Sequence, residues 1–194
     1  ELSRVFYDVA MDPEADIIVL TGAGRAFSAG GDIGWMQEMI DDAAVWERTR
    51  VEAKKIVFGL LDCEKPIIAS INGPAMGLGA TIALFCDVIF AGQSAIIADP
   101  HVSVGLVAGD GGAIIWPQLV GYARAKEYLM TGAQVSPQEA ERIGLVNYAV
   151  SDEELEARVY KFAERLDRGA TQAIRYSKAT VNIALKQIAH SVMD

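Results

Sequence analysis

Residues 65–92 read KPIIASINGPAMGLGATIALFCDVIFAG, and this stretch decides the fold class. Two short apolar runs, KPIIASING (65–73) and DVIFAG (87–92), are bounded by turn residues and predict strands. Between them, PAMGLGATIALFC (74–86) begins with glycines and then becomes apolar, which predicts a turn leading into a helix. A strand, a helix and a second strand in succession indicate an α/β core.

The alternation continues on both sides of this stretch. Further strands are expected at 17–22, a buried one, and at 94–100, and helices at 1–12, 41–61 and 113–132, with Pro117 interrupting the last. Two capping boxes, Ser136 with Glu139 and Ser151 with Glu154, predict helix starts, the first with Pro137 at its first position. A helical tail follows at 170–193, so we expect an α/β core over 1–150 and a helical region over 151–194.

Composition excludes several classes of protein. The 194 residues are 52% hydrophobic, which argues against a disordered chain. No window reaches the roughly 18 unbroken apolar residues of a membrane span, and the net charge of −9 argues against a nucleic-acid binder. Cys63 and Cys86 lie in apolar contexts without metal-ligand spacing, and residues 1–12 have no secretory pattern, so we expect a cytoplasmic protein with reduced thiols.

A second glycine-rich stretch, TGAGRAFSAGGDIGWM (21–36), also follows an apolar run. A dinucleotide fingerprint fails because Phe27 stands where a third glycine is needed after Gly22 and Gly24. No Gly-Lys-Ser/Thr phosphate loop is present either. The stretch is then either a tight loop without chemistry or, paired with the turn at 71–80, one of two turns that aim backbone N–H groups at a single oxygen.

Four stretches occur in a characteristic order: GAGRAFSAGGDI (22–33), residues 65–92, GLVAGDGG (105–112) and TGAQVSPQEAERIGLVNYAV (131–150). Together they resemble the signature stretches of the crotonase (enoyl-CoA hydratase/isomerase) superfamily over nearly the whole chain. The resemblance implies an α/β spiral of ββα turns, whose first part is missing here, followed by a helical region that assembles a homotrimer or a dimer of trimers. It also implies an acyl-CoA thioester as substrate, with no separate cofactor and no metal.

The resemblance further implies a set of site residues. The backbone N–H groups of Gly31 and Leu78 would form an oxyanion hole for the thioester carbonyl. Leucine stands where the family often has glycine, so the N–H is kept and the site is narrower. Substrate contacts are expected from Ala29, Asp32, Ile33 and Thr81, although Asp32 is equally suited to cap the following helix.

The sequence departs from the family at the two catalytic glutamates of its hydratases. Their positions hold Thr81 and His101, so we expect His101 and nearby Asp110 to carry proton transfer. Asp110 could orient His101, act itself as base or nucleophile, or only cap the next helix. His101 could have only a structural role, with its side chain hydrogen-bonded to the backbone of a turn.

Three functions follow from these residues. The leading one is an enzyme of the enoyl-CoA hydratase/isomerase type that stabilises a thioester enolate. The second keeps the fold but changes the reaction to hydrolysis, dehalogenation or decarboxylation. The third is a non-catalytic interaction protein.

Overall fold

The computed structural model describes residues 2–193, without the side chain of Ile33. Its helices are α1 (Leu2–Met11), α2 (Ile33–Asp41), α3 (Ala43–Asp62), α4 (Leu78–Leu84), α5 (Gly112–Thr131), α6 (Pro137–Ile143), α7 (Asp152–Asp167) and α8 (Thr171–Met193), with a 3₁₀ turn η1 at His101–Val104. Its strands are β1 (Ile18–Thr21), β2 (Ile67–Ile71), β3 (Ala75–Met76), β4 (Val88–Gly92), β5 (Ile97–Ala98) and β6 (Tyr148–Val150).

The strands form two parallel sheets. The larger has the order β1-β2-β4-β6, and the smaller pairs β3 with β5. In the larger sheet Ile18 aligns with Ile67, and Ile68 with Val88. Parallel neighbours need a crossover, and helices provide it, as in an α/β fold.

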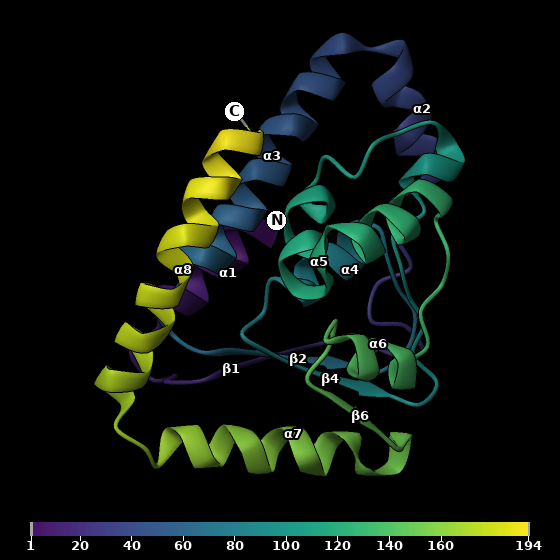
Figure 1. Cartoon of the computed structure of the whole chain (residues 1–194). Coiled ribbons are helices and arrows are strands. Elements are labelled where there is room, and N and C mark those ends of the chain that lie inside the picture. Colours follow the sequence, from purple (N-terminus) through teal and green to yellow (C-terminus); the bar gives the residue numbers. More distant parts are fainter. Residues whose placement is uncertain (1, 194) are drawn as a thin grey trace.

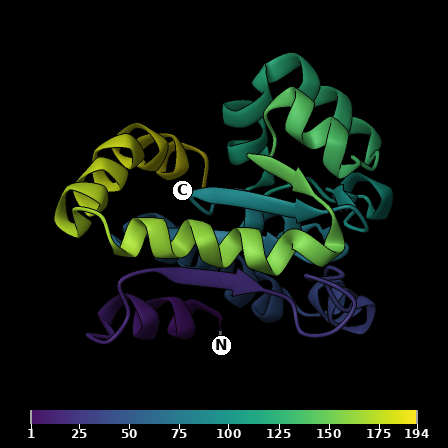
Figure 2. The same ribbon diagram turned by 90° about the horizontal axis from the view of Figure 1, so that it is seen from below.

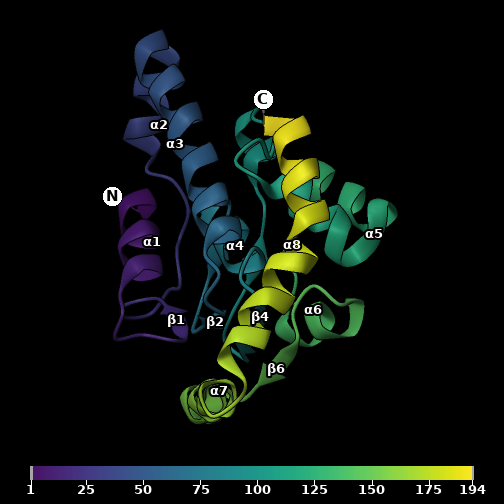
Figure 3. The same cartoon turned by 90° about the vertical axis from the view of Figure 1, so that its left-hand side faces the viewer.

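Helices cover both faces of the larger sheet (Figures 1 and 3). Helices α3, α4 and α5 lie on one side, and α7 runs along the strands on the other (Figure 2). Strand β2 is buried along its whole length, so every residue of IIASI faces protein on one side or the other. This double coverage explains why the run is continuously apolar instead of alternating.

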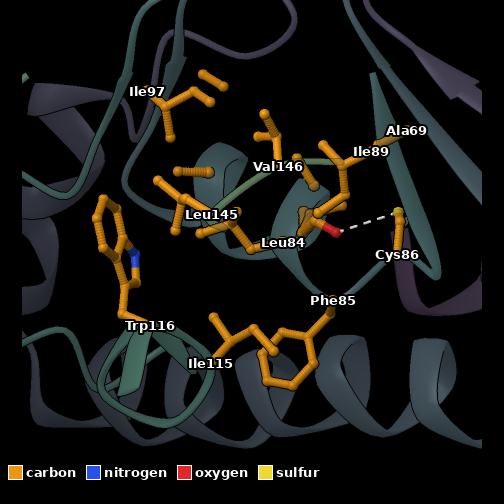
Figure 4. Close-up of a cluster of buried hydrophobic side chains, with 14 of the residues drawn as sticks. Ala69, Leu84, Phe85, Cys86, Ile89, Ile97, Ile115, Trp116, Leu145 and Val146 are labelled. Carbon is orange, nitrogen blue, oxygen red and sulfur yellow. Dashed lines mark hydrogen bonds between the residues drawn. The ribbon is translucent and has the colours of Figure 1, made fainter. Parts of the chain in front are cut away.

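The main core packs between the sheet and α3, α4 and α5. Trp116 is fully buried beside Leu145, and Phe85, the C-cap of α4, lies near Ile115 of α5 (Figure 4). The Cys86 thiol donates to the carbonyl of Ile82 at 3.3 Å inside this cluster. A smaller hydrophobic cluster around Phe90 packs between the sheet and α7.

The C-terminal helix is tied to the sheet by a buried ion pair. Lys178 Nζ of α8 lies 2.7 Å from Asp87 Oδ2, and this lysine side chain is only 6% exposed. The same carboxylate oxygen accepts the N–H of Ile67 at 2.7 Å. One buried charge therefore links α8, the start of β2 and the turn before β4.

The structure corrects four expectations. β1 is only partly buried because it is the edge strand of the sheet. Helix α5 passes through Pro117 and breaks at Gly121 instead, where φ 77° and ψ 161° are accessible to glycine. Ser151 is the N-cap of α7 as expected, but its hydroxyl donates to the Glu154 carboxylate at 3.4 Å instead of accepting a backbone N–H. Strand β6 lies in residues for which no element was expected. Ser136, by contrast, accepts the Glu139 N–H at 3.3 Å as predicted.

Candidate active site

The two glycine-rich stretches run side by side. Ser28 bridges to Ala75 in parallel, and the N–H of Met76 donates to the carbonyl of Ser28 at 2.9 Å. Close approach requires Gly79, because a Cβ there would lie 2.4 Å from Ser28 Cβ. The backbone just before Gly31 is thus bonded to the backbone just before Leu78.

The amides of Gly31 and Leu78 are available for a ligand. Leu78 begins α4, and the first N–H groups of a helix have no partner within it. Among residues 2–193, neither of these two amides donates a hydrogen bond to another protein group. Gly31 is exposed and Leu78 is half-buried, so an oxygen from outside can approach both turns.

The other residues of the first stretch lie at the entrance to α2. Asp32 is the N-cap of α2 and accepts the N–H of Trp35 at 3.0 Å, so its structural role is present. Ala29 is exposed in the loop. Ile33 begins α2, and its side chain lies outside the described part of the chain.

The structure brings His101 and Asp110 together. His101 Nε2 lies 3.5 Å from Asp110 Oδ2, and both side chains are mostly buried. Asp110 Oδ1 accepts the hydroxyl of Thr81 and the N–H of Gly112, each at 3.2 Å. Thr81 is fully buried in α4, so its hydroxyl fixes the Asp110 carboxylate from the protein interior.

Sequence reasoning missed Asp99. It follows β5, its side chain is 1% exposed, and its Oδ1 lies 2.5 Å from His101 Nδ1. The sequence signal was local, because the carboxylate in Asp-Pro-His lies only two residues before the histidine and can contact its ring. The ring therefore lies between two aspartates, one at each nitrogen.

The histidine also adjoins the second glycine turn. A Cβ on Gly77 would lie 3.4 Å from His101 Cε1 and 3.7 Å from Nε2. Gly77 has φ 53° and ψ −122° and is the N-cap of α4, directly before Leu78. The ring that can move a proton is thus packed against the turn that offers a free amide.

Charge and burial shift both titrating groups of the pair. The pKa of His101 is raised, first by its hydrogen bond to Asp99 and further by the charges of Asp110 and Asp99, against the opposing effect of burial. The pKa of Asp110 is also raised, because burial disfavours its charge more than His101 and its hydrogen bonds favour it. Shifted pairs of this kind occur at sites of proton transfer.

The cluster is poorly suited to a resident metal ion. Asp99, His101 and Asp110 offer ligand atoms within 4.8 Å of one another. However, Asp99 Oδ1 contacts Nδ1 of the ring and Asp99 Oδ2 packs against Gly112, which leaves Nε2 and Asp110 Oδ2 for an ion. Catalytic zinc sites have three protein ligands, so these residues favour proton chemistry without a metal.

Comparisons with known proteins identify the family of this chain. A family model for enoyl-CoA hydratase/isomerase matches residues 1–193. The crotonyl-CoA hydratase of Syntrophomonas wolfei is 39% identical over 173 residues, which are 88% of this chain and 65% of that protein. The short-chain-enoyl-CoA hydratase of Clostridium acetobutylicum is 35% identical over 94% of this chain and 69% of its own length. The chain thus spans about two thirds of the curated relatives it matches.

Solved structures show the same fold. An enoyl-CoA hydratase/isomerase from Mycobacterium paratuberculosis has a TM-score of 0.94 at 39% identity, covering all of this chain and 77% of that one. A β-diketone hydrolase from Anabaena has a TM-score of 0.92 at 30% identity, covering all of this chain and 77% of that one. These matches confirm the predicted crotonase fold, and the chain belongs to the enoyl-CoA hydratase/isomerase family.

Proposed function

We propose that this chain forms and reprotonates the enolate of an acyl-CoA thioester. The observation that carries the proposal is the position of His101, whose ring packs on Gly77 and faces Asp110. Removing a proton beside a thioester carbonyl places negative charge on the carbonyl oxygen. A base next to a turn with a free amide suits that change.

Each residue then has a role. The backbone N–H groups of Gly31 and Leu78 donate hydrogen bonds to the enolate oxygen, and the positive end of α4 adds to this stabilisation. His101 removes and returns the proton, while Asp110 stabilises the charged ring. The backbone at Ala29, Asp32 and Ile33 lines the coenzyme A end of the substrate, and Thr81 acts through Asp110.

The pair of His101 and Asp110 favours a reaction that moves one proton. An isomerisation takes a proton from one carbon and returns it to another, so a single base can serve both steps. Hydration must handle a water as well, and the two glutamates that the family resemblance implies are replaced here. We therefore rank double-bond isomerisation ahead of hydration.

Proton exchange in deuterium oxide is the test that does not depend on the final product. In saturated and 3-enoyl thioesters of several chain lengths, the proton beside the carbonyl should exchange with deuterium, and NMR measures this exchange. The His101→Ala variant should exchange the proton more slowly. Crotonyl-CoA hydration and 3-enoyl-CoA isomerisation then assign the product. Absence of exchange with every thioester would contradict the proposal.

A second candidate is the hydrolysis of a 1,3-diketone, favoured by the histidine–aspartate pair and by the likeness to a β-diketone hydrolase. His101 would take a proton from water, and the hydroxide would bond to one carbonyl carbon. The bond to the central carbon then breaks, its electron pair forms an enolate, and that enolate takes the proton. Cleavage of a diketone without thioester exchange would favour this candidate.

We also propose assembly as a homotrimer or a dimer of trimers in the cytoplasm. Helix α8 exposes Tyr176, Val181, Ile183 and Val192, which suits a contact between copies. None of the helices in the described part of the chain is both long and apolar enough to cross a membrane. Light scattering on the purified protein gives the assembly state.

A further inference from the structure

We infer that Asp99 is a positioning residue that fixes the His101 ring with Nε2 as its basic atom. The inference rests on the proposed function, because it assigns the base used there. Asp99 touches no substrate atom in this proposal and acts only through the histidine.

The first argument is the geometry of the ring. Asp99 Oδ1 lies 2.5 Å from Nδ1, and a carboxylate can only accept there, so Nδ1 carries the proton. In a neutral imidazole the other nitrogen is then a bare acceptor. That nitrogen, Nε2, is the one that faces Asp110 and lies beside Gly77.

The second argument is that Asp99 itself is held in one place. Its side chain is 1% exposed and follows directly on β5. Its Oδ2 lies against Gly112, where a Cβ would come within 2.3 Å, so only glycine leaves room for it. Among the described residues this oxygen has no hydrogen-bond partner. Oδ1 accepts the backbone N–H of His101 at 3.4 Å and lies 2.5 Å from the ring nitrogen, so both polar contacts of this costly buried carboxylate are to His101.

The third argument is electrostatic. Asp99 and Asp110 are the titratable groups that face the ring, from the end of β5 and from the loop before α5. When Nε2 takes a proton, the imidazolium is flanked by a carboxylate at each nitrogen. Asp99 thus both selects the tautomer and stabilises the protonated ring, as an orienting carboxylate does in a catalytic triad.

The test begins with NMR of the protein labelled with ¹⁵N-histidine. The chain has two histidines, and a His190→Gln sample assigns the signals. The neutral form of His101 should show a protonated Nδ1 and a bare Nε2. The opposite tautomer in the intact protein would overturn the inference, and this measurement needs no substrate.

Kinetic measurements on the Asp99→Asn variant are the second part of the test. The rate constant for thioester exchange should fall on the order of 10²–10⁴-fold with little change in KM, because the ring loses its fixed tautomer. Replacing the carboxylate by a neutral amide also lowers the pKa of His101, so the acid limb of the remaining activity should move to lower pH. A folded Asp99→Asn protein with the full rate would overturn the role.

Asp87→Asn is the matched control, since Asp87 is also largely buried but contacts Lys178 and Ile67 instead of the site. It should keep both the His101 tautomer and the exchange rate. If no thioester is a substrate at all, the proposed function fails, while the NMR arm still decides what Asp99 does.

Discussion

The hydroxyl of Thr81 lies 3.2 Å from the carboxylate of Asp110 and donates to it. Thr81 occupies a position where the family resemblance implies a glutamate, and the carboxylate that it contacts comes from the loop before α5. The hydroxyl holds this carboxylate beside His101.

The oxyanion proposal predicts a large effect for Leu78→Pro. Proline lacks the N–H group but is tolerated at the first position of a helix, where Leu78 lies. Gly77 has no Cβ, which reduces the clash of a following proline. The rate of thioester exchange should fall on the order of 10²–10³-fold. Leu78→Ala keeps the amide and should keep the exchange rate within a few-fold, and equal rates for both variants would exclude this donor.

The raised pKa of His101 predicts the pH profile. The base must be neutral, and Asp99 and Asp110 favour its protonated form, so kcat/KM should fall on acidification through a pKa above the ordinary 6.5. The same shift means that His101 stabilises the fold below pH 6.5 and loses this contribution as pH rises through its folded pKa. An acid limb below pH 6 would contradict the assignment.

Asp110→Asn should remove activity and increase stability. Burial raises the pKa of Asp110, so its ionised form disfavours the folded state at all pH values above the unfolded pKa near 3.8. The asparagine side-chain oxygen can still accept hydrogen bonds from Thr81 and Gly112, and its neutral amide removes the unfavourable buried charge. We expect at least about a 10²-fold lower exchange rate and a Tm higher by roughly 2–4 °C at pH 8.

Asp62→Asn is the control for this variant. Asp62 is exposed and pairs with Lys186 at 2.8 Å, a contact worth about 0–1 kcal/mol. The exchange rate should stay unchanged, with Tm shifting little. A fall in Tm for Asp110→Asn would show that the charged carboxylate is needed by the fold.

Lys178→Met should destabilise the protein without changing the chemistry. It leaves the largely buried Asp87 without its cation, and breaking such a pair costs about 3–5 kcal/mol. Urea unfolding measures the loss. Adding Asp87→Asn removes the stranded charge while keeping an acceptor for the Ile67 N–H, so the double variant should recover most of the stability. Equal stability of the single and double variants would contradict this account.

The sequence predicted the fold where its signals were long and local. The apolar runs at β2 and β4 and the glycine turn before α4 have few alternative structures. Strands β3 and β6 were missed because two or three residues give no periodicity, and their pairing depends on partners far along the chain. The exposure of β1 follows from its place at the sheet edge, which composition does not encode.

The site was predicted in part. His101 and Asp110 stood out because they replace or adjoin expected acids, and the structure brings them together. Thr81 is 29 residues from Asp110, so its hydrogen bond depends on how α4 packs against the loop. Asp99 is only two residues from His101 but resembles an ordinary turn residue until the ring is seen to face it.

The all-parallel order of the larger sheet has a consequence for how the protein folds. No hairpin can nucleate that sheet, because each neighbouring strand arrives only after a crossover has been closed. Loop-closure entropy must be lost before the pairing energy is gained, so refolding should be slow for a chain of this size. The Ser28–Ala75 contact joins two such crossovers, and catalytic competence should therefore return late in refolding.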